Sequence, residues 1–178
     1  MNASDSDITE CSRMLLESEQ AWEFVHGKEG PSRMAEFKRL KEDNKLRAAV
    51  EFARAFVVKY NLRIYWSPGN SPQGGSCPAP IDAIFRKAIE GKEIGKQEIL
   101  GNKDAQFADY IACAKIFLYD EKAWEFVYGK QGSSKMAEFK TLLGDKKDAA
   151  EMEFMEGFFL EIGALFMKAV APGLLRQM

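Results

Sequence analysis

Apolar side chains recur at helical spacing near the start of the chain. Between residues 8 and 25 they fall on one face of a helix, with Ser18 filling one step of the pattern. Gly27 suits the C-terminal cap of this helix. A short second helix is expected to begin at Gly30, because the proline that follows it is favoured in a first helical turn. Asp43 suits the cap of a third, longer helix. The members of the first apolar face are Ile8, Cys11, Leu15, Trp22 and Val25.

The same pattern returns in the second half of the chain. The segment AWEFVHGKEGPSRMAEFKRL, residues 21–40, recurs without a gap as AWEFVYGKQGSSKMAEFKTL, residues 123–142, and 15 of the 20 positions are identical. The alignment extends over 3–56 and 105–158, at a constant offset of 102, but matches are sparser on both flanks. Such a repeat indicates a tandem duplication. We therefore predict an all-α fold, a pseudo-twofold helical bundle built from two three-helix units.

The region between the two copies breaks the helical pattern. Residues 67–80, SPGNSPQGGSCPAP, hold four of the six prolines and predict a long loop. IDAIFRKAIEG after it is typical of a helix. We expect a first repeat unit over 1–66, the loop and an insert helix over 67–104, and a second repeat unit over 105–178, with the two units packed together as one domain.

The composition disfavours some classes of function but points to none. The chain is 46% hydrophobic and 29% charged with a net charge of −2, which gives no electrostatic reason to expect nucleic acid. Cys11, Cys77 and Cys113 are too few and too scattered to predict a disulfide framework, and Cys11 and Cys113 are expected to be small buried hydrophobes. The polar N-terminus, without a signal-peptide pattern, predicts a cytoplasmic location. The longest apolar stretch is interrupted by charges, so no membrane span is expected.

The repeated segment contains the best candidate for a binding site. Its identical charges are Glu23, Lys28, Glu36 and Lys38, with Glu125, Lys130, Glu138 and Lys140 in the second copy. Surface charges usually tolerate exchange, so these either form salt bridges between the helices or face a ligand. A Gly-Lys-x-Gly turn before a helix start places backbone N–H groups beside cations and could bind an anion. The anion-site residues would be Gly27, Lys28, Gly30, Ser32 and Arg33, and Gly129, Lys130, Gly132, Ser134 and Lys135. The competing interpretation is a purely structural turn.

A second candidate surface lies on the last helix, which is apolar on most sides. Phe154, Phe158, Phe159 and Phe166 belong to it. A helix of this kind must be buried against something. The sequence leaves two interpretations open: a central core helix, or an exposed aromatic surface that binds a partner.

No catalytic residue, metal site or cofactor follows from the sequence. His26 is the only histidine, and no nucleophile is visibly paired with it. We therefore expect a non-enzymatic protein-interaction module, such as an adaptor, an inhibitor or a neutralising protein, that binds another protein or forms a homodimer. The alternatives are a small-molecule or anion binder that uses the two glycine turns, and an enzyme of unknown type that uses the insert loop.

Overall fold

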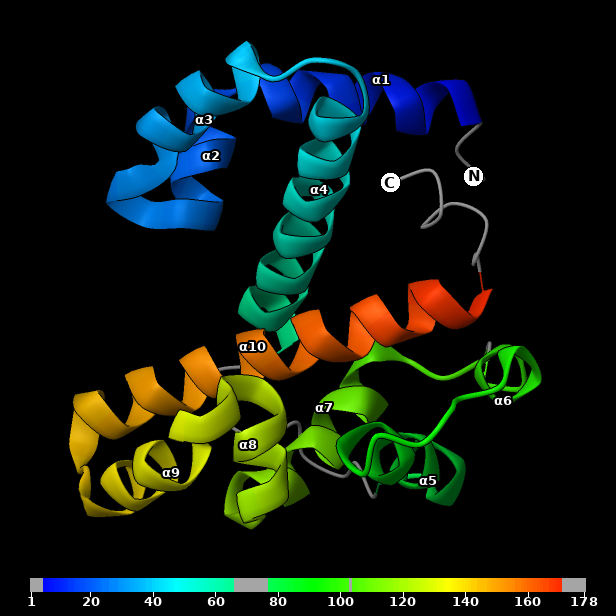
Figure 1. Cartoon of the computed structure of the whole chain (residues 1–178), viewed down its shortest axis with the longest axis vertical. Coiled ribbons are helices and arrows are strands. Elements are labelled where there is room, and N and C mark those ends of the chain that lie inside the picture. The colour runs from blue at the N-terminus through cyan, green and yellow to red at the C-terminus, as the bar shows by residue number, and fades with distance from the viewer. Residues whose placement is uncertain (1–4, 66–76, 103, 171–178) are drawn as a thin grey trace. The chain divides into compact units, whose positions relative to one another are not determined.

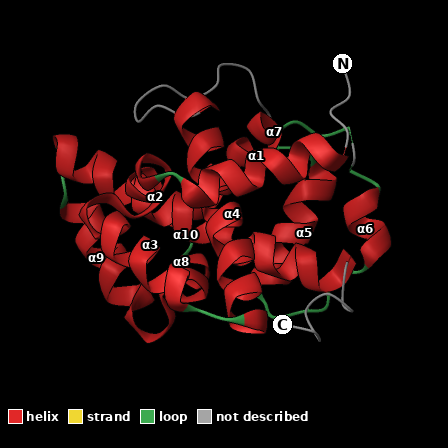
Figure 2. Cartoon of the chain, turned by 90° about the horizontal axis from the view of Figure 1, so that it is seen from above, coloured by secondary structure: helices red, strands yellow, loops and turns green. Residues whose placement is uncertain are grey.

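The computed structural model describes residues 5–65, 77–102 and 104–170, and all regular structure among them is helical (Figures 1 and 2). The all-α prediction is thus confirmed. None of the helices in these ranges is long and apolar enough to cross a bilayer. The described residues fall into two compact units, one within Met1–Lys59 and one within Tyr60–Leu175.

Unit 1 begins with two short helices, α1 (Asp5–Glu17) and α2 (Glu19–His26). A single 3₁₀ turn, η1 (Gly27–Glu29), leads into α3 (Gly30–Arg39), which lies beside α2 (Figure 1). The long helix α4 (Glu42–Tyr65) follows, and the boundary between the units falls within it. The expected helix start at Gly30 and the expected cap at Gly27 are both confirmed.

The first apolar face of unit 1 was expected to form one helix, and this was wrong. The chain leaves the helical conformation at Ser18, whose φ and ψ are −94° and 112°. Its hydroxyl accepts a hydrogen bond from the N–H of Ala21, so Ser18 caps a new helix. A serine side chain that satisfies an unpaired N–H in this way stabilises a helix start. The apolar spacing continues across the break, which is why periodicity alone missed it.

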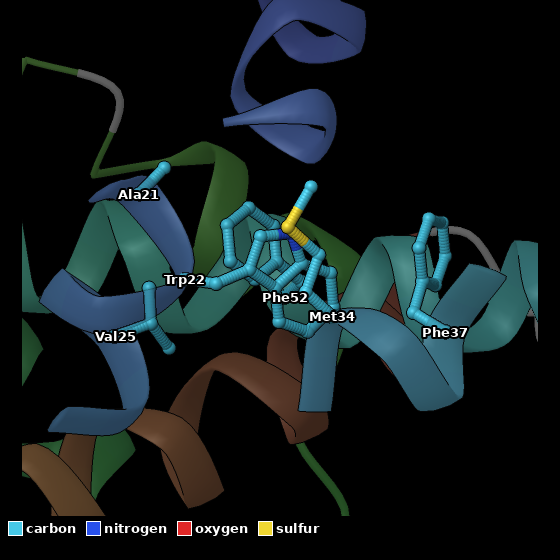
Figure 3. Close-up of a cluster of buried hydrophobic side chains, with 6 residues drawn as sticks. All are labelled: Ala21, Trp22, Val25, Met34, Phe37 and Phe52. Carbon is cyan, nitrogen blue, oxygen red and sulfur yellow. The ribbon is translucent and has the colours of Figure 1, made fainter. Parts of the chain in front are cut away.

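The core of unit 1 is a cluster of buried side chains from α2, α3 and α4. Figure 3 shows Trp22 and Met34 converging on Phe52, and the rings of Trp22 and Phe52 are stacked with centroids 4.2 Å apart. The indole Nε1–H of Trp22 donates to the carbonyl of Leu16 at 2.9 Å, so its one polar group is satisfied. Truncating this ring to alanine would cost about 3–5 kcal/mol. The buried members of the cluster are Ala21, Trp22, Val25, Met34, Phe37 and Phe52.

Unit 2 starts with the helices that have no counterpart in unit 1. These are α5 (Ala79–Ile89), which confirms the predicted insert helix, and the short α6 (Lys96–Leu100). Residues 66–76 of the expected loop lie outside the described residues, and so does the C-terminal segment 171–178.

Apart from the 3₁₀ turn η2 (Phe117–Tyr119), whose counterpart in unit 1 is the last turn of α1, the rest of unit 2 follows the order of unit 1 at an offset of 102 residues. It consists of α7 (Phe107–Ile116), η2, α8 (Glu121–Tyr128), η3 (Gly129–Gln131), α9 (Gly132–Thr141) and α10 (Gly144–Val170). Asp120 replaces Ser18 as the side-chain cap, and accepts from the N–H of Lys122 at 2.9 Å.

The helix α10 forms the core of unit 2. It contacts α5, α6, α8 and α9. The ring of its Phe154 stacks on the ring of Trp124, with centroids 4.6 Å apart. The Nε1–H of Trp124 donates to the carbonyl of Leu118 at 2.9 Å, which matches the bond of Trp22 in unit 1. The local packing of the two tryptophans is therefore the same in the two units.

Candidate functional site

The two glycine turns have the same backbone geometry. Gly27 has φ 61° and ψ −135°, and Gly129 has φ 63° and ψ −135°. Each donates its N–H to the carbonyl four residues earlier, Glu23 in one unit and Glu125 in the other. A positive φ with this ψ is open to glycine and strained for other residues. The identity of this glycine in both copies thus has a structural cause.

The second glycine of each turn is required by helix packing. A Cβ on Gly30 would lie 2.5 Å from the backbone N of Glu23, and a Cβ on Gly132 would lie 2.4 Å from that of Glu125. The start of α3 therefore rests directly on the backbone of α2, and α9 rests on α8 in the same way. Both glycines of the Gly-Lys-x-Gly pattern are explained without a ligand.

The other residues of the predicted anion site are partly engaged inside their own unit. The hydroxyls of Ser32 and Ser134 donate at 2.9 Å to backbone carbonyls three residues earlier. Arg33 pairs with Glu29 at 3.3 Å, and Lys135 lies over the ring of Tyr128, 4.8 Å from its centroid. The Arg33–Glu29 ion pair and the Lys135–Tyr128 cation–π contact are both partly exposed to solvent, so each interaction is weak. Lys28 and Lys130 are exposed.

Carboxylates lie at the start of α9, where an anion would have to bind. The hydroxyl of Ser133 donates to Glu121 at 2.6 Å and to Glu125 at 3.3 Å. A helix N-terminus carries partial positive charge, so these side chains are well placed to complement it. The same negative charges would repel an incoming anion, and this geometry favours the structural interpretation of the turn over the anion site.

The repeated charges all point to solvent. Glu23, Lys28, Glu36 and Lys38 are exposed, and so are Glu125, Lys130, Glu138 and Lys140. None of these eight takes part in an ion pair found among residues 5–65, 77–102 and 104–170. Of the two explanations offered by the sequence, salt bridges between the helices are thus not seen in the described part. We call these eight side chains the repeated charges.

The phenylalanines of the last helix are mostly core residues. Phe154 and Phe158 are fully buried, Phe159 is 6% exposed, and Phe166 is half-buried. The ring of Phe158 packs against that of Phe85 at 5.2 Å, within unit 2. The first three are therefore unavailable for contact with a partner, and the central-helix interpretation fits them better.

His26 stacks on Trp22 in unit 1, with ring centroids 5.6 Å apart, and Tyr128 stacks on Trp124 at the same distance in unit 2. Burial lowers the pKa of His26 below its usual value, and the nearby charges of Arg33 and Lys59 lower it further. The ring thus serves as a neutral packing group. Its replacement by a tyrosine in the other copy fits that role.

A disulfide between Cys77 and Cys113 was missed by the sequence reasoning. The two Cα atoms are 4.6 Å apart, and the bond ties the start of α5 to α7 inside unit 2. Cys113 is buried as expected, but it is bonded, and Cys11 is an exposed free thiol. The expectation of two equivalent buried thiols was therefore wrong. The two cysteines are 36 residues apart and lie on different elements, so the sequence gives no sign that they form a pair.

Comparison with protein-family models, with curated proteins and with solved structures finds no match to this chain. The arguments for function therefore come from the geometry of the chain itself.

Proposed function

We propose that this protein is a binding module for another protein, and that the repeated charges form its contact surface. One observation supports this proposal above all. Within the repeated segments 21–40 and 123–142, charged residues are identical in type at four equivalent positions, are exposed, and form no ion pair among the described residues. Contacts inside the folded chain account for only a part of them.

Helix dipoles explain only part of this identity. Lys38 and Lys140 lie in the last turn of α3 and α9, where a cation is favourable by about 0.3–1 kcal/mol. Arginine would serve the dipole equally well. A specific contact in which lysine and glutamate are not exchangeable is therefore the better explanation. Glu36 and Glu138 have no such dipole role, because they lie inside α3 and α9.

The presence of the same four exposed charges in both units suggests a partner that is present twice. We infer that the units derive from a tandem duplication, supported by their equal turns and equal tryptophan packing. Each chain would then bind two copies of one partner, or one partner with a repeated epitope. Linked sites of this kind raise the overall affinity through effective concentration. The pseudo-twofold packing and the expected domain boundaries stay predictions, as does the homodimer.

The test compares two variants with the same change in charge. Lys28→Glu with Lys130→Glu alters one repeated charge in each unit. Lys41→Glu with Lys146→Glu also alters one exposed lysine in each unit, at positions that differ between the copies. The full chain is recovered from the cells that naturally contain it, and bound proteins are identified by quantitative mass spectrometry.

We expect a protein that copurifies with the wild type and with the control variant, and is lost from the Lys28→Glu, Lys130→Glu variant. Equal retention by both variants would contradict the proposal, as would the absence of any stoichiometric protein. A small anion found instead by native mass spectrometry, at up to two per chain, would support the anion alternative. The enzyme alternative depends on the insert loop, most of which lies outside the described residues.

A further inference from the structure

Unit 2 contains an open groove between α5 and the start of α8. Two adjoining hollows of about 370 and 430 Å³ form it, and they share Ile89, Glu90 and Lys122. The first also reaches Arg86 and Phe117, and the second reaches Phe126. Pockets for small molecules have similar volumes but enclose most of the ligand. An open groove of this kind is better suited to a segment of polypeptide.

The floor of the groove is apolar. Phe117 is only 1% exposed, so it closes the base, and the half-buried Ile89 and Phe126 offer apolar surface from the two sides. The ring of Phe126 is held by an edge contact with Phe158, at 6.0 Å between centroids. An apolar side chain laid across Ile89 and Phe126 would remove both from water, which is favourable in proportion to the area covered.

The walls of the groove carry a surplus of negative charge. Its carboxylates are those of Glu90, Asp120, Glu121 and Glu125, against the cations of Arg86 and Lys122.

Two of these charges, Arg86 on α5 and Glu90 just after its last residue, already have partners. Arg86 pairs with Asp82 at 2.8 Å and lies over the ring of Phe117, and Glu90 pairs with Lys92 at 2.8 Å. On the α8 side Asp120 caps its own helix. Glu121 and Glu125 accept hydrogen bonds from the neutral hydroxyl of Ser133, which does not neutralise them, so their two charges face a ligand against the one cation of Lys122.

The groove belongs to the second copy alone. Its α8 wall has counterparts in unit 1 at Glu19, Gln20 and Glu23, but its other wall is α5, which lies in the insert between the copies. Lys122 also replaces Gln20. This surface is therefore separate in origin from the repeated charges, although Glu125 belongs to both.

We propose that this groove binds an extended basic segment of a partner protein, with an apolar side chain over Ile89 and Phe126 and lysine or arginine side chains beside Glu121 and Glu125. Charge complementarity decides the chemistry of the occupant. An acidic segment would meet the uncompensated glutamates and be repelled, whereas a basic one gains from them and from steering by the local field.

The probe is a short fluorescein-labelled peptide of alternating lysine and leucine, with a glutamate–leucine peptide as its charge-reversed control. Binding to the full chain is followed by fluorescence anisotropy. The groove variant is Glu121→Lys, and the matched control is Asp145→Lys, at an exposed carboxylate that does not line the groove. Circular dichroism checks that both variants fold.

We expect the lysine–leucine peptide to bind about fivefold more weakly to the groove variant, because one exposed charge attraction becomes a repulsion. The control variant and Lys28→Glu with Lys130→Glu should bind it as the wild type does, which separates this inference from the proposed function. In an NMR titration the peptide should shift the signals of Ile89 and Phe126. Equal affinity for both variants, preference for the acidic peptide, or shifts confined to other residues would overturn the proposal.

Discussion

The close contact between Gly132 and α8 can be tested by adding one methyl group. In Gly132→Ala the new Cβ would lie 2.4 Å from the backbone N of Glu125 and 2.5 Å from the carbonyl carbon of Trp124. Ordinary contacts of this kind are 3.4–4 Å. The neighbouring atoms are backbone, so no side chain can rotate away, and the two helices must separate by about 1 Å in a close-packed interior.

Two opposing effects set the size of the loss. Overpacking typically costs about 1–3 kcal/mol. Alanine is intrinsically better than glycine in a helix by about 1 kcal/mol, and Gly132 has ordinary helical φ and ψ of −56° and −49°. Without the contact, Gly132→Ala would therefore stabilise the protein. With it, the overpacking cost should lie in the upper half of that range, about 2–3 kcal/mol, because the helix crossing cannot relax locally, and this leaves a net loss of about 1–2 kcal/mol.

The free energy of unfolding is measured on the full chain by urea denaturation, followed by circular dichroism and tryptophan fluorescence. Ala137→Gly, at an exposed position of the same helix, measures the intrinsic effect of glycine with no close contact. Gly30→Ala should repeat the loss in unit 1. A Gly132→Ala variant as stable as the wild type, or more stable, would refute this account of the turn.

Three further predictions concern single features of the two units. Glu42 begins α4 with φ 48°, which is unfavourable for a residue with a side chain, so Glu42→Gly should raise the free energy of unfolding by about 0.5–1 kcal/mol in urea titrations; an unchanged value would contradict this. The native chain should offer one thiol to an alkylating reagent and three after reduction, and loss of the disulfide, which closes 36 residues, should cost about 4 kcal/mol. His26 has a lowered pKa in the folded state, so the unfolded chain binds its proton first as pH falls. Stability should therefore drop as the pH falls below about 7, and His26→Tyr should reduce the drop; an identical pH profile for that variant would exclude the effect.

Much of the helical order could be predicted from the chain because its signals are local. The start of α3 is marked by the glycine and proline at 30 and 31, and the apolar spacing of residues 81–91 was enough to predict α5. The break at Ser18 was missed because a serine on an apolar face can either continue a helix or cap a new one. Only the backbone conformation decides between the two.

The disulfide and the groove could not be predicted, because each depends on contacts between distant elements. Cys77 pairs with Cys113 only because α5 packs on α7, and nothing in either local sequence records that contact. The bond also bears on location. Disulfides persist in oxidising compartments, so the bond between Cys77 and Cys113 favours a compartment of that kind. The cytoplasmic location stays a prediction, and the bond argues against it.

The residues that are identical in the two copies of the repeat are of two kinds, those that the fold requires and exposed charged residues. The contrast between these two kinds is the strongest argument for a binding role. Buried matches such as Trp22 and Trp124 are explained by packing, and the glycines by backbone geometry. Both kinds would persist in any pair of stable units. Exposed glutamates and lysines contribute little to folding, so stability alone would let them drift, as the neighbouring Arg39 and Thr141 have done. We therefore propose that a molecule outside the chain constrains these solvent-facing charges, and a charge-swapped partner surface that restores binding to the Lys28→Glu, Lys130→Glu variant would identify it.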